Sequence, residues 1–318
     1  MKPPSTLQPE ATPEVERPSG FPDRPITLLV GSTKGAEADI AARTVIPRLE
    51  KGLGRPVVVV DRLGGGGLDA WSELKQAKPD GYTLGLIASP QFQLMALDPR
   101  TKAPFAIGDF VPAANQLWDP VAILVRSGSG LQSLRELIAA ARSQPEGISI
   151  SVPATGAAER LAITDLQRKV GLKLRVTEFI DATNARLAAL SGQVEAVCGR
   201  YSYLAPLARS RQGRFLIFLE EKRLPEWPEV PTLKEMGVDV LFPSSLGYAV
   251  PKGTPQEVVD YMAWALHLAM SAPEPQAALR ESGLGMRFMG PEQYASFLAD
   301  QAERTRELLP TLLLKPSS

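Results

Sequence analysis

The sequence predicts an α/β protein of two lobes, each built on its own mainly parallel sheet. Short β-rich runs alternate with helical patterns from residue 26 to 87, and the same alternation resumes from 121 to 219. Such alternation is typical of βαβ units and a parallel sheet. The 318 residues are enough for two domains or for one large α/β unit, and they can bury a substantial core. A pattern that occurs twice therefore indicates two α/β domains.

The first lobe begins with five predicted elements. Apolar runs predict strands at 26–30, 57–60 and 83–87, and helical patterns lie between them at 38–52 and 68–77. Asp39 precedes Ile40, Val45, Ile46 and Leu49, and this spacing places one helix face on the sheet.

The second lobe repeats this order. Strands are predicted at 121–125, 147–152, 174–179, 194–197 and 214–219, with helices at 129–144, 158–169 and 182–191. A proline-rich stretch then interrupts regular structure, and it contains Pro225, Pro228, Pro231 and Pro243. Structure returns as a strand at 247–250 and as helices near 255–270, 275–282 and 291–309.

These breaks predict how the chain is shared between the lobes. The chain should cross near Asp119 and again between Leu241 and Ser245. Lobe 1 is then 21–120 plus 245–318, and lobe 2 is 121–244. Residues 1–20 are rich in Pro, Glu, Ser and Thr, so we expect a disordered leader there.

Composition excludes several classes of function. Lys plus Arg and Asp plus Glu both number 35, so no long-range field favours nucleic acid or an anionic membrane. The single cysteine, Cys198, and single histidine, His267, exclude a Cys/His zinc site and a disulfide framework. No apolar run is long enough to cross a bilayer. We expect no metal, no cofactor and no catalytic residues, since nucleophile and nucleotide motifs are also missing.

Two loops that directly follow strands are the main candidate binding elements. After the first strand come Ser32, Thr33, Lys34 and Gly35, and after the strand at 147–152 come Thr155, Gly156 and Ala157. Small residues between a strand and a helix direct backbone N–H groups at an anion. The two loops therefore predict the capture of a small acidic molecule in a cleft between the lobes.

The other candidate residues have structural alternatives. We expect Asp39 to cap the first helix or to organise its loop rather than to contact an anion, and Gly64–Gly67 to be a supporting turn rather than a phosphate cradle. An arginine that follows a strand can pair with a second carboxylate. Candidates whose alternative is a loop, a surface position or a helix cap are Ser89, Gln91, Arg160, Asp181, Thr183 and Arg200.

The ordered motifs resemble one family over nearly the whole folded chain. They are the segment 21–43, Leu-Gly-Arg-Pro-Val-Val-Val-Val at 53–60, Asp-Arg with its glycine run from 61, Lys-Pro-Asp-Gly-Tyr-Thr-Leu at 78–84, Ser-Leu-Arg-Glu-Leu-Ile at 133–138, Gly-Gln-Val-Glu at 192–195, Pro-Glu-Val-Pro-Thr at 228–232 and Val-Pro-Lys-Gly-Thr-Pro at 250–255. In this order they resemble the substrate-binding proteins of tripartite tricarboxylate transporters, the Bug proteins.

The resemblance implies a bilobed periplasmic-binding-protein fold of the Venus flytrap type. It also implies a monomeric, exported, non-enzymatic protein that closes on a small carboxylate and delivers it to a membrane permease. A periplasmic location would follow removal of a signal sequence, and the leader would also suit a lipid anchor. The alternative is a ligand-sensing protein that signals to a partner.

The chain departs from the family pattern in the loops that would select the ligand. Lys34 and Glu37 add charge near the first loop, and Arg160 stands where the family often has histidine. The family's Pro-Tyr-Lys-Gly block is replaced by a segment that ends in Asp181, and Ser245 stands where many members have tryptophan.

Overall fold

The computed structural model describes residues 15–313, which divide into two units. The N-terminal unit ends at Trp118 and resumes over Ser245–Thr305, whereas the central unit comprises Asp119–Ser244 and the chain from Arg306. Residues 1–14 of the predicted leader lie outside the described residues. Val15 already packs against the core of the N-terminal unit, and Arg17 Nε donates to the Phe21 carbonyl at 3.0 Å. The part of the chain that packs against the N-terminal unit therefore begins before residue 21.

The N-terminal unit contains a six-stranded sheet in the order β11-β4-β10-β3-β1-β2. β1 is parallel to β2 and β3, whereas β10 is antiparallel to β3 and β11 is antiparallel to β4. The sheet is therefore mixed. Its strands are β1 (Ile26–Val30), β2 (Val57–Asp61), β3 (Thr83–Ser89), β4 (Phe110–Asp119), β10 (Ser244–Pro251) and β11 (Met286–Met289).

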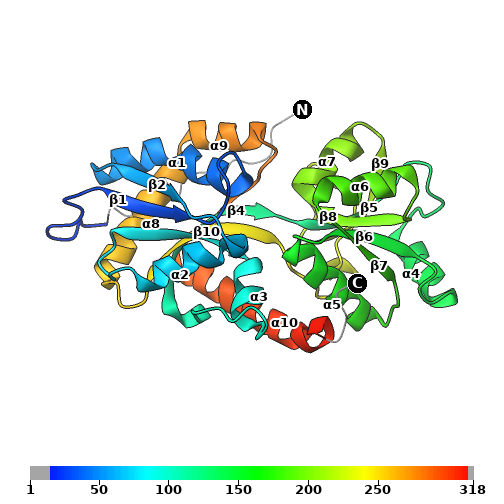
Figure 1. The fold of residues 1–318 in the computed structure, drawn as a ribbon. Coiled ribbons are helices and arrows are strands. Elements are labelled where there is room, and N and C mark those ends of the chain that lie inside the picture. The colour runs from blue at the N-terminus through cyan, green and yellow to red at the C-terminus, as the bar shows by residue number, and fades with distance from the viewer. Residues whose placement is uncertain (1–14, 314–318) are drawn as a thin grey trace. The chain divides into compact units, whose positions relative to one another are not determined.

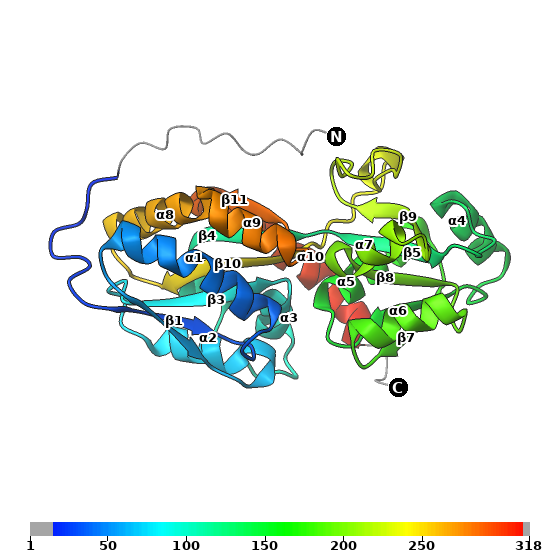
Figure 2. The same cartoon turned by 90° about the horizontal axis from the view of Figure 1, so that it is seen from above.

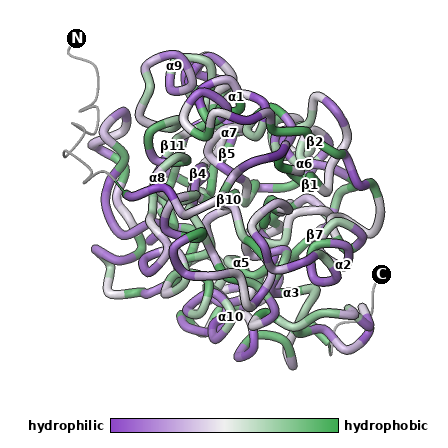
Figure 3. Tube along the Cα trace, turned by 90° about the vertical axis from the view of Figure 1, so that its left-hand side faces the viewer, coloured by the Kyte–Doolittle hydropathy of each residue, from purple (hydrophilic) through white to green (hydrophobic). Residues whose placement is uncertain are grey.

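Helices cover both faces of this sheet (Figures 1 and 2). One face carries α1 (Glu37–Leu53), α8 (Gln256–Ser271) and α9 (Pro273–Glu281), which share the larger apolar cluster with the strands. The other face carries α2 (Leu68–Gln76), α3 (Gln91–Leu97) and the start of α10 (Pro291–Leu313). Short 3-10 turns form η1 (Gly65–Gly67) and η2 (Ile107–Asp109). In Figure 3, hydrophilic residues prevail along the peripheral helix α9.

The central unit contains a five-stranded sheet in the order β7-β6-β8-β5-β9. β6 is parallel to β7 and β8, and β5 is antiparallel to β8 and β9. In Figure 1, α6 and α7 lie on one face and α5 on the other. The elements are β5 (Val121–Arg126), α4 (Leu134–Ser143), β6 (Ser149–Pro153), α5 (Ala157–Val170), β7 (Arg175–Phe179), α6 (Ala182–Ser191), β8 (Ala196–Arg200), α7 (Tyr201–Arg209), β9 (Gly213–Leu219) and η3 (Lys234–Met236).

Among the β-strands and α-helices of the described residues, four have no counterpart in the sequence prediction: β4, β11, α3 and α7. β4 is buried along most of its length on both faces, so its residues show no apolar–polar alternation. Its polar Gln116 is satisfied inside the core, where its amide donates to the Ala41 carbonyl at 2.8 Å and accepts from the Tyr248 hydroxyl at 2.7 Å. The remaining strands and helices follow the predicted α/β order, with ends that differ by a few residues.

Candidate functional site

The loop at 31–36 connects β1 to α1 and is organised by one buried carboxylate. Asp39 is only 2% exposed, and its Oδ2 accepts from the Gly35 amide at 2.8 Å. Its Oδ1 accepts from Arg43 Nε at 2.5 Å, and Arg43 Nη2 reaches Asp61 at 3.3 Å. Asp39 therefore holds the loop in place and uses both of its oxygens to do so.

The start of α1 presents backbone N–H groups without a cap. Ala36 stands at the N-cap position and supplies no side-chain hydrogen bond. Within residues 15–313, the amides of Ala38 and Asp39 have no hydrogen-bond partner. Uncapped N–H groups and the helix dipole favour an anion at this end of α1.

Three serine hydroxyls lie buried at the same end of this sheet. Ser89 ends β3, Ser245 pairs with it from antiparallel β10, and Ser32 follows β1, the other neighbour of β3. Each Oγ is buried and has no hydrogen-bond partner among the described residues. A buried hydroxyl without a partner costs free energy, and most such groups in proteins have one. The three hydroxyls thus form a polar surface suited to a ligand or ordered water.

The glycine run supports the loop from behind. A Cβ on Gly31 would lie 2.7 Å from the Gly67 Cα, so this close approach of two backbones requires glycine. Gly67 has a φ of 109° and leads directly into α2. Gln91, at the start of α3, lies beside Gly66. The structure thus gives Gly64–Gly67 a packing role under the first loop.

In the central unit, the loop at 154–156 connects β6 to α5 in the same manner. Gly156 is the N-cap and gives no side-chain cap, and the amides of Ala157 and Ala158 have no partner in the described chain. The Ala154 amide donates to the Phe179 carbonyl at 2.7 Å, which fixes the loop to the end of β7. Thr155 is exposed. The α5 start therefore offers a second set of uncapped amides.

Arg200 is engaged within the central unit. Its Nη2 donates to the Tyr203 hydroxyl at 2.6 Å and its Nη1 to Ser244 Oγ at 3.3 Å, while its Nε lies 3.7 Å from Glu159. Glu159 is 2% exposed and lies against Gly156. Bidentate pairing of Arg200 with a ligand carboxylate would require these contacts to break. Sequence reasoning did not select Glu159, whose position at a helix start resembles that of Asp39.

The other charged candidates also have partners in their own unit, except Lys34. Arg160 Nε pairs with Glu178 at 3.1 Å. Asp181 caps α6 by accepting from the Asn184 amide at 2.8 Å, and hydrogen bonds from Asn184 lower the pKa of this carboxyl. Thr183 is exposed in the first turn of α6. Lys34 is exposed and makes no ion pair within the described chain.

Other reactive groups are scarce in the described part of the chain. Cys198 is a free, fully buried thiol whose pKa is raised by burial. Residues 15–313 contain no group of three or more His, Cys, Asp or Glu side chains that could hold a metal ion. None of the helices described is both long and apolar enough to span a membrane.

Comparisons with known proteins agree over most of the chain. The family model described as "Tripartite tricarboxylate transporter family receptor", TctC, matches residues 41–314. A UPF0065 protein of Bordetella bronchiseptica is 30% identical over 302 residues, which cover 93% of this chain and 88% of that protein. The protein BugT of Bordetella pertussis is 28% identical over 287 residues, covering 89% of this chain and 88% of BugT.

A solved structure gives the same result for the fold. A TctC solute-binding protein from Polaromonas, described as having no ligand, is 27% identical with a TM-score of 0.85 and covers 92% of this chain and 99% of its own. The two-unit α/β architecture is therefore that of the bilobed periplasmic binding proteins. The chain belongs to the tripartite tricarboxylate transporter receptor family, whose members are solute-binding receptors and not enzymes.

Proposed function

We propose that this protein captures a small organic acid and delivers it to a tripartite tricarboxylate-type permease. The single observation that carries the proposal is the set of Ser32, Ser89 and Ser245 hydroxyls, which are buried without partners beside the uncapped start of α1. A carboxylate accepts hydrogen bonds from both kinds of donor. It would satisfy the three hydroxyls and the helix amides together.

The ligands of related folds support a carboxylate. Two solved structures of this fold, each 24% identical to this chain, hold malate and adipate. Other matched structures are described as a periplasmic transporter and as the periplasmic binding protein BugD. We therefore propose that this protein works in the periplasm, and we keep the monomer that the family resemblance implies as part of the proposal.

The two strand-end loops have different parts in this proposal. The loop at 31–36 and the three serines bind the carboxylate. The loop at 154–156 of the central unit offers a second set of donors, the α5 amides and the Thr155 hydroxyl. Arg160, Asp181 and Arg200 act mainly within the central unit, since each already has a charged or polar partner there.

Ligand-dependent stabilisation tests this function. Native mass spectrometry of freshly purified protein should identify a retained acid, and adding that acid back to stripped protein should raise the melting temperature by mass action. Ser245→Ala should weaken binding about tenfold, the effect of losing a hydrogen bond to a charged group. The same substitution should leave the ligand-free protein as stable as the wild type or more so, since it removes an unsatisfied hydroxyl.

Ser282→Ala is the matched control, because Ser282 is exposed and its Oγ bonds only to the Ala278 carbonyl of its own helix. Unchanged affinity in Ser245→Ala, or a panel of organic acids that never shifts the melting temperature, would contradict the proposed site. Cells that lack the protein should also lose uptake of the identified acid. Uptake that persists while a cellular response to the acid disappears would favour the signalling alternative.

A further inference from the structure

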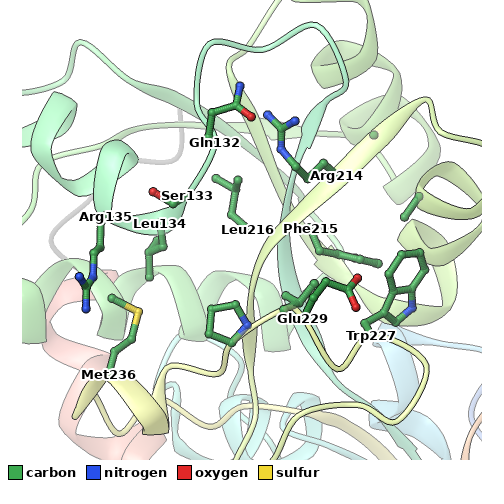
Figure 4. A pocket seen from close by; sticks show the side chains of 14 residues that line it. Gln132, Ser133, Leu134, Arg135, Arg214, Phe215, Leu216, Trp227, Glu229 and Met236 are labelled. Carbon is green, nitrogen blue, oxygen red and sulfur yellow. The ribbon is translucent and has the colours of Figure 1, made fainter.

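A cavity of about 610 Å³ lies entirely within the central unit (Figure 4). It is bounded by the start of α4, by β9 and by the segment 227–236. β5 aligns Arg200 and Leu219 with Val121, whereas Gly213 aligns with Arg126 at the other end of β5. The cavity borders residues 213–216 of β9, so it lies at the opposite end of the sheet from Arg200 and the loop at 154–156.

Apolar side chains held by packing form part of the wall of this cavity. Phe215 and Leu216 are buried, and Trp227 meets Phe215 edge-on with ring centroids 5.2 Å apart. Trp227 Nε1 donates to the Tyr201 hydroxyl at 3.3 Å, which holds the indole in place. β9 is an edge strand, and its pairing with β5 is shifted at Leu216, so this side of the strand opens onto the cavity.

One end of the cavity carries a cation that lacks a counter-charge. Arg214 is half-buried and makes no ion pair within the described chain. Its Nη2 donates to the neutral Leu131 carbonyl at 2.7 Å, and its Nε is buried without a hydrogen-bond partner in residues 15–313. Figure 4 shows Arg214 beside Gln132 at one end of the cavity. A half-buried charge beside apolar walls is costly unless an anion pairs with it.

We propose that this cavity binds a small amphiphilic monocarboxylate. Its carboxylate pairs with Arg214, and its apolar body lies against Leu216, Phe215 and Trp227. Glu229 lies beside Trp227 in Figure 4, so a second negative charge at that end of the ligand would be repelled. The volume is within the usual range of small-molecule sites, roughly 300–1,000 Å³. This site is separate from the strand-end loops of the proposed function and goes beyond it.

Titration with octanoate, with uncharged octanol as its partner probe, tests the proposal on the intact protein. Octanoate should alter the fluorescence of Trp227 and bind at least about tenfold more tightly than octanol, as expected for a charge-assisted pair. Arg214→Gln should remove this preference for octanoate. Arg142→Gln, an exposed arginine of α4 outside the cavity, should keep it.

Trp227→Phe should abolish the fluorescence change, and Ser245→Ala should leave it intact because Ser245 belongs to the other unit. Equal affinity for octanoate and octanol would overturn the proposal, as would a fluorescence change that persists in Trp227→Phe. If circular dichroism shows that Arg214→Gln does not fold, the comparison of octanoate with octanol on the wild type tests the proposal instead. Loss of the Ser245-dependent acid site would not affect these outcomes.

Discussion

At the residue scale, Asp39 and Glu159 occupy equivalent places in the two units. Each is the third residue of a helix that follows a strand-end loop, and each is 2% exposed. Each lies near an arginine, Arg43 or Arg200, and contacts a loop glycine, Gly35 or Gly156. In both units, an internal carboxylate contacts the loop, while two amides in the first turn of the helix have no partner among the described residues.

Asp39→Asn should destabilise the protein by about 1.5–3 kcal/mol, the range for hydrogen bonds that involve a charged group. An asparagine amide accepts only at Oδ1, so it cannot keep both hydrogen bonds, the one from Gly35 and the one from Arg43. Urea unfolding measures the change, and Asp61→Asn is the control, since Asp61 is more exposed and makes one longer contact with Arg43. A loss in Asp39→Asn no larger than the loss in Asp61→Asn would contradict the special role of Asp39 in this loop.

The sequence predicted that Asp39 organises its loop, but it did not predict the pairing of Glu159 with Arg200. The loop-organising role of Asp39 is local, since its partners Gly35 and Arg43 both lie four residues away. Glu159 and Arg200 are joined only because β8 pairs with β6, the strand that leads into α5. Likewise, Ser245 lies next to Ser89 only because β10 pairs with β3 in an antiparallel manner. Single-sequence patterns carry no information about such distant pairings.

At the element scale, one carboxylate ties neighbouring strands of the central sheet together. Glu195, just before β8, accepts hydrogen bonds from the amide and the hydroxyl of Ser149, the first residue of β6. Partial burial raises the pKa of Glu195, but these hydrogen bonds outweigh burial and hold the pKa below the ordinary value of 4.5. The charged form is therefore the one that the folded sheet favours.

The stability contributed by Glu195 should be complete above the ordinary pKa of 4.5 and should be lost as the pH falls through the lower folded-state pKa. The wild type should thus have a higher melting temperature than Glu195→Gln at neutral pH. This difference in melting temperature, the gap, should disappear as the pH is lowered. Thermal melts over a pH series measure this gap. Glu221→Gln, at an exposed position just after β9 and outside any helix, should show no such pattern. A gap that stays constant with pH would rule out the ionic contribution.

Elements with a clear period were predictable, and those buried on both faces or made by tertiary contacts were not. The alternation of strands and helices gave α6 at its observed bounds and most other elements within a few residues. β4 and the short α3 lacked such a signal, since β4 is buried on both faces and α3 has only 7 residues. The antiparallel β10 was read as a strand, but its place between β4 and β3 was not predictable from its own residues.

At the scale of the whole molecule, a net charge of zero leaves ligand recognition to local groups. Binding of the identified acid should therefore weaken by less than about threefold between roughly 0.05 and 0.5 M salt, because buried donors are screened little. Calorimetric titration at several salt concentrations measures this. Lys34→Gln should flatten any remaining salt dependence, because Lys34 is exposed. A steep loss of affinity with salt would instead assign the binding to surface charge.

The position of β10 inside the N-terminal sheet has a consequence for folding during synthesis. β10 lies between β4 and β3, yet it begins at Ser244, after the strands of the central unit have been made. Domains generally fold as units while the chain emerges from the ribosome. The central unit therefore has all of its strands first, and the unit that was started first is closed last. Ser245 belongs to β10, so the three serine hydroxyls come together only when β10 joins the N-terminal sheet.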